Sequence, residues 1–405
     1  MDNDSLQISL ITCSPGHDTY AMFGHTAIRV TDYRQQPTTQ LRFRDVVYNY
    51  GMFNYNSENF IYRFVKGETD YILGIEPADF FFERYNERGV TVTEQVLNLT
   101  LSEKETLSQK LIVNSMPENR TYRYNWLYDN CTTRARDAIE SSIDGEVTYK
   151  ATASSALRHR TTSAATPYAK TDDTASSVTN DCTTTRDILH EYTAVSDWTR
   201  FGIDMVLGEE IDRPLTARQQ MFIPANYMDA ADGAVITDAS GSQRPLVSAT
   251  ITPIHSAETR PADNTHSSLM CTTGLLFVAV GLAFIELQRR KTFKWFDASL
   301  AFVLGLAGCL IAFLFFFSEH AGVDTNYLVL LFNPLHFIAI PFILRRQTRT
   351  LSYVTLAVVL LFLLTILLTG QNINIAILPV AFTLLVRIAV NLGNFSYLCK
   401  LNNKK

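Results

Sequence analysis

Five long apolar runs in the C-terminal part constrain this chain more than any other feature. They cover about 269–287, 298–317, 327–344, 351–369 and 375–392, and they follow a polar, charge-rich part that extends to about residue 265. An apolar run of about 18 residues or more is long enough to cross a bilayer as a helix. Five such runs folded as core helices would leave no amphipathic surface toward water. We therefore interpret 266–405 as an all-α membrane bundle of about five transmembrane helices.

The loops between these runs differ in charge, and the difference predicts an orientation. Lys and Arg residues lie in 288–296, in 345–350 and in the C-terminal tail, whereas 318–326 and 370–374 contain none. The positive-inside rule then places the basic loops and the C-terminus in the cytoplasm, and an odd number of spans places 1–265 outside it. The start of the chain is acidic and shows no export signal, so we expect either a trimmed signal peptide or an internal signal in 269–287.

The pattern of residues 1–265 predicts an α+β extracytoplasmic domain. Strands are expected at about 7–13, 24–32, 45–53, 71–75 and 90–100, and helices at about 59–67, 102–116 and 130–142. Ser102 is expected to open the second helix through a capping box. The Ser/Thr/Ala-rich stretch 148–179 predicts a flexible insertion. A net charge of −5 gives no reason to expect nucleic acid as a partner.

Cys131 is the candidate nucleophile of this domain. It shares the exported part with Cys13 and Cys182, so at most one internal disulfide can form there and one thiol is left over. At the start of a helix, unpaired N–H groups and the helix dipole lower the pKa of a thiol. The same N–H groups are candidate donors to an oxyanion. The alternative is a structural cysteine, or one half of a disulfide with Cys13 or Cys182.

His25 and Asn49 complete the candidate catalytic group. A cysteine nucleophile needs a base, commonly a histidine, and His25 follows Gly24 at the start of a predicted strand. Asn49, on the neighbouring strand, is the candidate to bind the other imidazole nitrogen and fix the tautomer. Alternatively, His25 is a satisfied polar strand residue and Asn49 only bridges strands. This chemistry requires no metal and no cofactor.

Several short motifs raise the weight of the catalytic interpretation. They are Phe-Gly-His-Thr-Ala-Ile-Arg at 23–29, Tyr-Asn-Tyr-Gly at 48–51, Tyr-Asn-Trp at 124–126, Asp-Asn-Cys-Thr-Thr-Arg at 129–134, the stretch 208–224, and the segments 317–320 and 333–336. Together they resemble the Lnb-type bacterial lipoprotein N-acyltransferases over nearly the whole chain. The order of His before Cys is also similar to the permuted papain-like folds, NlpC-like or lecithin:retinol acyltransferase-like. After His320, the sequence departs from the proline expected in relatives.

The resemblance implies the last step of bacterial lipoprotein maturation at the inner membrane, with the catalytic domain in the periplasm. An acyl chain would move from a phospholipid to Cys131 as a thioester, and then to the amine of a diacylated lipoprotein. The implied partners are thus a phospholipid donor, a diacylated lipoprotein acceptor and the bilayer. His25 would act as base and proton shuttle. Substrate-binding roles are expected for Gly24, Tyr50, Asn130 and Arg134.

Several polar residues of the membrane part are further candidates. His320, Asp324 and Asn326, in the predicted outer loop, are candidates to bind a phospholipid head group, and His336, within the third span, is another candidate. Arg387 lies inside the last span, where an ionisable residue is either functional or snorkels to the interface.

Two other classes of function stay open. One is a membrane-anchored Cys/His hydrolase, such as a phospholipase, a peptidase or a peptidoglycan amidase, since a papain-like fold supports all of these. A peptidoglycan hydrolase needs only one anchor, which disfavours that substrate. The other is a transport or assembly protein with a structural Cys131.

Overall fold

The chain divides into two compact units. The computed structural model describes residues 6–16, 18, 21–33, 44–149, 183–256, 262–289 and 292–402, with side chains up to residue 393. Unit 1 comprises Met1–Tyr192 and Pro214–Arg260, and unit 2 comprises Thr193–Arg213 and Pro261–Lys405. The segment Thr193–Arg213 therefore belongs to the second unit by its contacts, although it lies within the N-terminal part of the sequence. The predicted insertion at 148–179 falls outside the described residues from position 150 onward.

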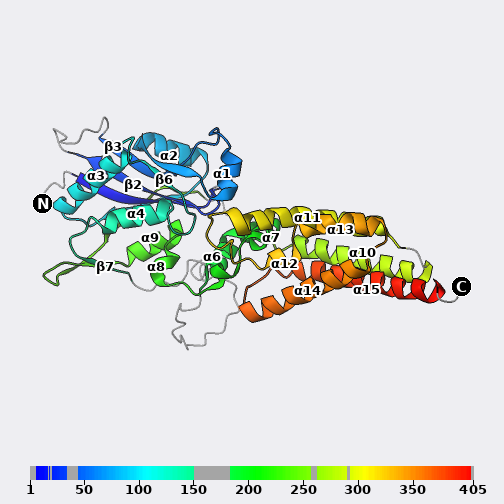
Figure 1. Ribbon diagram of the computed structural model, residues 1–405. Coiled ribbons are helices and arrows are strands. Elements are labelled where there is room, and N and C mark those ends of the chain that lie inside the picture. Colours follow the sequence, from blue (N-terminus) through cyan, green and yellow to red (C-terminus); the bar gives the residue numbers. More distant parts are fainter. Residues whose placement is uncertain are drawn as a thin grey trace, which may run out of the picture. The chain divides into compact units, whose positions relative to one another are not determined.

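Unit 1 is built on a seven-stranded sheet in which all neighbouring strands are antiparallel (Figure 1). Its strand order is β10-β5-β1-β2-β3-β4-β6, and a smaller sheet has the order β7-β8-β9. The strands are β1 (Leu6–Cys13), β2 (His25–Asp32), β3 (Asp45–Met52), β4 (Asp70–Pro77), β5 (Val92–Leu97), β6 (Thr121–Arg123), β7 (Glu146–Thr148), β8 (Val235–Thr237), β9 (Gln243–Pro245) and β10 (Val247–Ile254).

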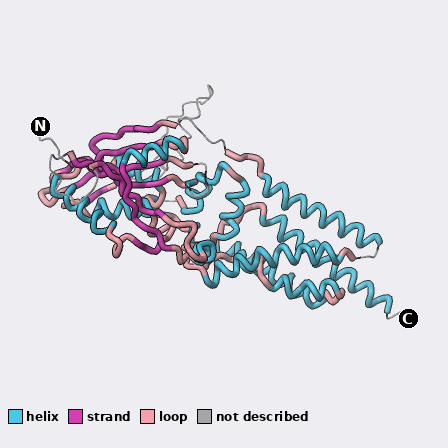
Figure 2. The backbone as a smooth tube through the Cα atoms, turned by 90° about the horizontal axis from the view of Figure 1, so that it is seen from above, coloured by secondary structure: helices cyan, strands magenta, loops and turns pink. Residues whose placement is uncertain are grey.

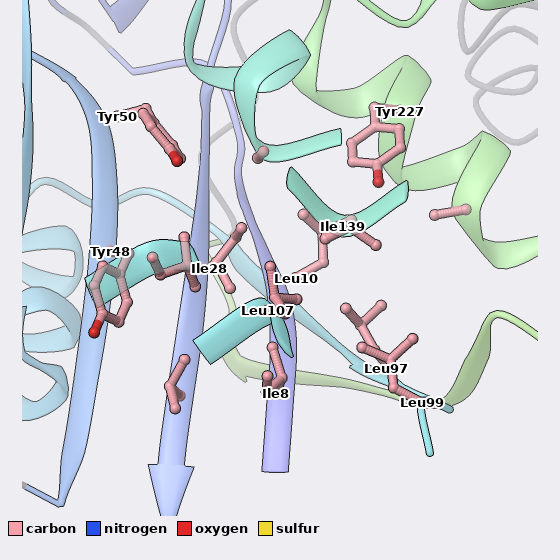
Figure 3. Packing of buried hydrophobic residues seen from close by; sticks show 14 of the residues in the cluster. Ile8, Leu10, Ile28, Tyr48, Tyr50, Leu97, Leu99, Leu107, Ile139 and Tyr227 are labelled. Carbon is pink, nitrogen blue, oxygen red and sulfur yellow. The ribbon is translucent and has the colours of Figure 1, made fainter. Parts of the chain in front are cut away.

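Helices cover both faces of the large sheet. Those of unit 1 are α1 (Phe60–Lys66), α2 (Ala78–Glu87), α3 (Leu101–Ser115), α4 (Cys131–Glu140), α6 (Thr185–Tyr192), α8 (Ala217–Gln220) and α9 (Pro224–Asp232). Successive side chains of a strand point to opposite faces, so β1 and β2 contribute side chains to two separate hydrophobic cores. Leu10 and Ile28 pack with helices α3 and α4 (Figure 3), whereas Ile11 and Ala27 pack with Phe81 of α2.

Unit 2 is helical, and among its described residues three helices are long and apolar enough to cross a membrane. These are α10 (Ser267–Arg289), α11 (Lys294–Phe317) and α14 (Arg349–Thr369). Figure 2 shows the long helices of this unit running alongside one another. The remaining helices are α7 (Asp197–Val206), α12 (Leu328–Leu331), α13 (Leu335–Leu344) and α15 (Ile377–Asn402), with 3-10 turns η2 (Thr193–Val195) and η3 (Glu209–Asp212).

The third predicted span is not one helix, because the chain breaks between α12 and α13. Asn333 and Pro334 lie at the break, where Pro lacks an N–H group and disfavours a helical residue before it. Gly308 of α11 packs directly on this break. A Cβ at Gly308 would lie 2.4 Å from the backbone N and C atoms of Asn333. The glycine therefore allows α11 to approach the interrupted helix.

We expect Gly308→Ala to lower the thermal stability of the protein, because the added methyl group meets backbone that cannot turn aside. Overpacking of this kind costs about 1–3 kcal/mol. Gly281→Ala is the matched control, since a Cβ at Gly281 of α10 has no atom within 4 Å. Thermal unfolding of the full chain in detergent measures both. Equal midpoints for the two variants would contradict the close packing at Asn333.

The segment Thr193–Arg213 is bound to two loops of unit 2 by polar contacts. The N–H of Gly208 donates to the carbonyl of Gly322 at 2.6 Å, and the N–H of Gly322 donates to the Glu210 carboxylate at 2.9 Å. In the second loop, the backbone N–H of Asn372 donates to the Asp212 carboxylate at 3.1 Å. Hydrogen bonds thus hold the segment Thr193–Arg213 to both loops.

Candidate active site

The candidate catalytic residues meet at one end of the large sheet of unit 1. His25 is the first residue of β2 and pairs with Cys13, the last residue of β1. The intervening chain turns back at Gly24, whose φ of 78° lies in the left-handed region that favours glycine. Cys131 is the first residue of α4, and Asn49 lies on β3. Residues far apart in the sequence are therefore brought together by strand register and one helix start.

Asn130 fixes the start of α4 and with it the position of Cys131. Its side-chain oxygen accepts from the N–H groups of Thr132 and Thr133 at 2.8 and 3.0 Å, and the Thr133 hydroxyl accepts from the N–H of Asn130 at 2.8 Å. Its side-chain amide donates to the carbonyls of Trp126 and Phe222. Asn130 is thus a capping residue. The expectation that the first N–H groups of this helix receive an oxyanion is wrong for Thr132 and Thr133, because both donate to Asn130.

A chain of hydrogen bonds orients the His25 ring. The Nε2 atom of His25 is hydrogen-bonded to Oδ1 of Asn49, and Nδ2 of Asn49 donates to Glu76 at 3.1 Å. Arg84 in turn donates to both carboxylate oxygens of Glu76 at 2.6 Å. Because Asn49 accepts through its oxygen, Nε2 carries a proton, and Nδ1 is the nitrogen left to face Cys131.

The environment of Cys131 favours its thiolate. Burial raises the pKa of this thiol, but the positive charge and hydrogen bond of His25 and the N–H of Thr26 outweigh it, so the pKa lies below its ordinary value. For His25, burial lowers the pKa, but the charge and hydrogen bond of Cys131 raise it above the ordinary value. Each group thus stabilises the charged form of the other, as in an ion pair.

Cys13 and Cys131 are both free thiols, so the predicted alternative of a disulfide between them is wrong. Burial raises the pKa of Cys13, which makes this neighbour a poor nucleophile. Cys182 lies outside the described residues.

Alkylation of Cys131 by iodoacetamide should report its lowered pKa. Because the thiolate reacts, we expect the rate to rise with pH and to level off below the ordinary thiol pKa of 9.0. The same protein unfolded in denaturant should show the ordinary midpoint. Mass spectrometry of the labelled Cys131 peptide across a pH series gives both curves, and coincident curves would exclude a stabilised thiolate.

Gly51 leaves space beside the side chains of Cys131 and His25. Its φ is 89°, and a Cβ there would lie 3.5 Å from Cβ of Cys131 and 3.9 Å from Cε1 of His25. A larger residue would therefore contact both members of the pair.

Two other predicted substrate-binding residues have partners within the protein. The Tyr50 hydroxyl is buried and accepts from Asn114 at 3.1 Å. Arg134 makes two hydrogen bonds with Asp129, at 2.6 and 2.7 Å, and lies over the Tyr122 ring. Both side chains are thus held by neighbours within unit 1, and their substrate-binding roles stay predictions.

The predicted head-group ligands His320, Asp324 and Asn326 lie in one loop of unit 2. Asn326 is only 1% exposed, and its side chain binds the Met205 carbonyl, the Leu328 N–H and the Gln371 amide. These contacts use both ends of its amide group, so the prediction of a head-group contact is wrong for Asn326. The backbone N–H of His320 donates to the Ser318 hydroxyl at 3.3 Å.

One alternative predicted that Arg387 snorkels to the membrane interface, and the structure shows that this is wrong. Arg387 is 3% exposed and pairs with Asp297 of α11 and Glu286 of α10. The three side chains form a buried charge cluster between the helices of unit 2.

Sequence reasoning missed Glu76 and Arg84, which orient Asn49. One signal was available: Glu76 directly follows the predicted strand 71–75, and an arginine follows eight residues later. A glutamate followed by an arginine is common on protein surfaces. Only the pairing of Asn49 with Gly74 in β4 brings Glu76 to the site.

Comparison with known families covers both parts of the chain. A family model described as the Lnb N-terminal periplasmic domain matches residues 1–167, which include His25, Asn49 and Cys131. A second, described as the Lnb transmembrane domain, matches residues 262–396. A search of curated proteins found no match, and a search of solved structures found none either. The two matches indicate a membrane-anchored protein with an extracytoplasmic N-terminal domain, and the chain belongs to the Lnb family.

Proposed function

We propose that this protein is a lipoprotein N-acyltransferase, which moves an acyl chain from a phospholipid through a Cys131 thioester to the amine of a diacylated lipoprotein. One observation carries the proposal: a cysteine with a lowered pKa, paired with His25, lies in a domain attached to membrane helices. Such a nucleophile suits acyl transfer. Both proposed substrates are embedded in lipid, which explains why the catalytic domain is attached to membrane helices.

In the first half of the proposed reaction, the Cys131 thiolate attacks an ester carbonyl carbon of the phospholipid. In this proposal, the N–H of Cys131 donates to the oxyanion that forms. The His25 imidazolium then gives its Nδ1 proton to the departing glycerol oxygen. The C–O bond breaks, a lysophospholipid leaves, and the acyl group remains on the sulfur as a thioester.

In the second half, the neutral His25 acts as a base. The α-amino group of the lipoprotein's N-terminal cysteine attacks the thioester carbonyl and loses a proton to Nδ1 of His25. The C–S bond breaks, and an amide is left on the lipoprotein. The thiolate and imidazolium are restored together, so no net proton is gained or lost by the enzyme.

We also propose the fold of the catalytic domain and the topology of the membrane part. The catalytic domain is a permuted papain-like domain in the periplasm, and the membrane part crosses the inner membrane five times with its C-terminus in the cytoplasm. The basic loops and the three long apolar helices support this topology, with α12–α13 and α15 as the other two crossings.

Intact-mass spectrometry of the purified full chain tests the reaction. The protein is mixed with phospholipid and then with a diacylated lipopeptide; Cys131→Ala and, as matched control, Cys271→Ala are run beside it. Cys271 is an exposed thiol of α10. We expect the wild type and Cys271→Ala to gain the mass of an acyl group. The amine of the lipopeptide should then remove this acyl group. Discharge by water alone would instead identify a phospholipase, and the absence of any Cys131-dependent adduct would exclude the covalent mechanism.

A further inference from the structure

Helix α1 presents an unusual apolar surface close to the candidate active site. None of its seven residues is buried, although Ile61, Tyr62 and Phe64 are large and apolar. Ile61 is 77% exposed, and Tyr55 in the preceding loop is 56% exposed. A helix this short has little stability of its own, so its position depends on what holds it. Adjoining exposed apolar residues of this kind mark a surface that contacts a partner or a membrane.

The charges of α1 do not oppose an apolar partner. Arg63 pairs with Asp70 at 2.8 Å, and Lys66 pairs with Glu68. Each cation of the helix therefore has an anion beside it. The outward surface of α1 is consequently aromatic and aliphatic, with its charge balanced locally.

A row of aromatic rings connects α1 to the interior. Phe60 of α1 stacks on Phe53 with ring centroids 5.7 Å apart, and Phe53 lies 4.9 Å from Tyr71. Tyr71 stacks on Tyr124 at 4.1 Å. We name Phe60, Phe53, Tyr71 and Tyr124 the aromatic ladder. Its outer end is at the exposed helix.

The inner end of the ladder lies beside the nucleophile. Phe53, Tyr124 and Cys131 pack against the same hydrophobic core, which includes Tyr71. A Cβ at Gly51 would lie 3.5 Å from Cβ of Cys131 and 4.0 Å from the Tyr122 hydroxyl, and Tyr122 is the strand partner of Tyr71. An apolar path of ring faces thus runs from the surface of unit 1 to Cys131.

We propose that α1 and the aromatic ladder are the acyl-chain entry site, at which α1 contacts the fatty acyl chains of the bilayer and the donor's chain follows the ladder to Cys131. The inference rests on the proposed function, because it names the route of the acyl donor to the same nucleophile. The continuity of the ladder with Cys131 and the attachment of the domain to membrane helices favour this occupant. Phe and Tyr side chains are also common where proteins meet the bilayer interface. A peptide or glycan would need many polar partners, which the exposed face of α1 lacks.

Photo-crosslinking tests the contact without requiring catalysis. The full-length Cys131→Ala protein is placed in nanodiscs with a phospholipid that carries a diazirine on its acyl chain, and adducts are mapped by peptide mass spectrometry. We expect adducts in residues 53–66. The double variant Ile61→Ser/Phe64→Ser should lose about tenfold or more of this signal, since two apolar contacts are removed. Phe80→Ser, at a 63% exposed position of α2, is the matched control and should leave it unchanged.

A kinetic measurement separates binding from chemistry. On the wild-type cysteine background, Ile61→Ser/Phe64→Ser should raise the KM for phospholipid and leave iodoacetamide alkylation of Cys131 unchanged. Thioester formation without adducts at 53–66, or with an unchanged KM, would overturn the entry site while the proposed function stands. Adducts at 53–66 in a protein that never forms a thioester would support the acyl contact and overturn the proposed function instead.

Discussion

Replacing His25 by alanine is expected to slow acylation of Cys131 by about 1,000-fold, which lies within the range for loss of a general acid–base residue. Two effects combine. The thiol loses the charge and hydrogen bond that offset its burial, so its pKa rises. The departing glycerol oxygen also loses its proton donor. Single-turnover acylation, followed by intact mass, measures the rate, and the alkylation midpoint of Cys131 should move upward in the same variant.

His190→Ala is the matched control for this experiment. His190 lies on α6 and has no part in the proposed chemistry, so His190→Ala should acylate at the wild-type rate. Asn49→Ala should give an intermediate loss, because Asn49 positions the ring and does not exchange protons with substrate. An unchanged acylation rate in His25→Ala would exclude His25 as the proton donor.

Strands β1 to β5 and the start of α4 could be predicted because local pattern decides them, whereas β6 to β10 were not predicted. Strands β1 to β3 begin and end within about two residues of the expected positions, since buried strands carry long apolar runs between turn residues. The helix expected at about 130–142 begins at Cys131, and Asn130 caps it. The capping box of α3 was misplaced: Thr100, and not Ser102, caps the helix together with Glu103. Both threonine and serine suit this position, so residue type alone does not decide between them.

What could not be predicted depends on contacts between distant segments. The hydrogen bond of Asn49 to Glu76 follows from the pairing of β3 with β4, which includes an irregular register between Asn49 and Met52. The break before α13 depends on Pro334 and on the close approach of Gly308. Likewise, a hydropathy pattern shows that Arg387 is embedded in an apolar run, but it does not show which carboxylates lie opposite.

Replacing Arg387 by leucine is expected to destabilise unit 2 strongly. The guanidinium binds Asp297 at 2.5 Å and Glu286 at 2.9 Å, and all three side chains are buried. Removing Arg387 would leave two buried carboxylates without their arginine partner in a low-dielectric region. Breaking a buried pair in this way costs about 3–5 kcal/mol. Thermal unfolding of the full chain in detergent should show a clear fall in the midpoint.

Two further variants distinguish a structural cluster from a functional one. Arg345→Leu removes an exposed arginine and should leave the midpoint near that of the wild type. Combining Arg387→Met with Glu286→Gln and Asp297→Asn removes every charge of the cluster, and it should recover most of the lost stability because no unpaired charge remains. If the triple variant also forms the Cys131 thioester at the wild-type rate, the cluster holds α10, α11 and α15 together and takes no part in the chemistry. A stable triple variant that forms no thioester would contradict this and give the cluster a part in acyl transfer.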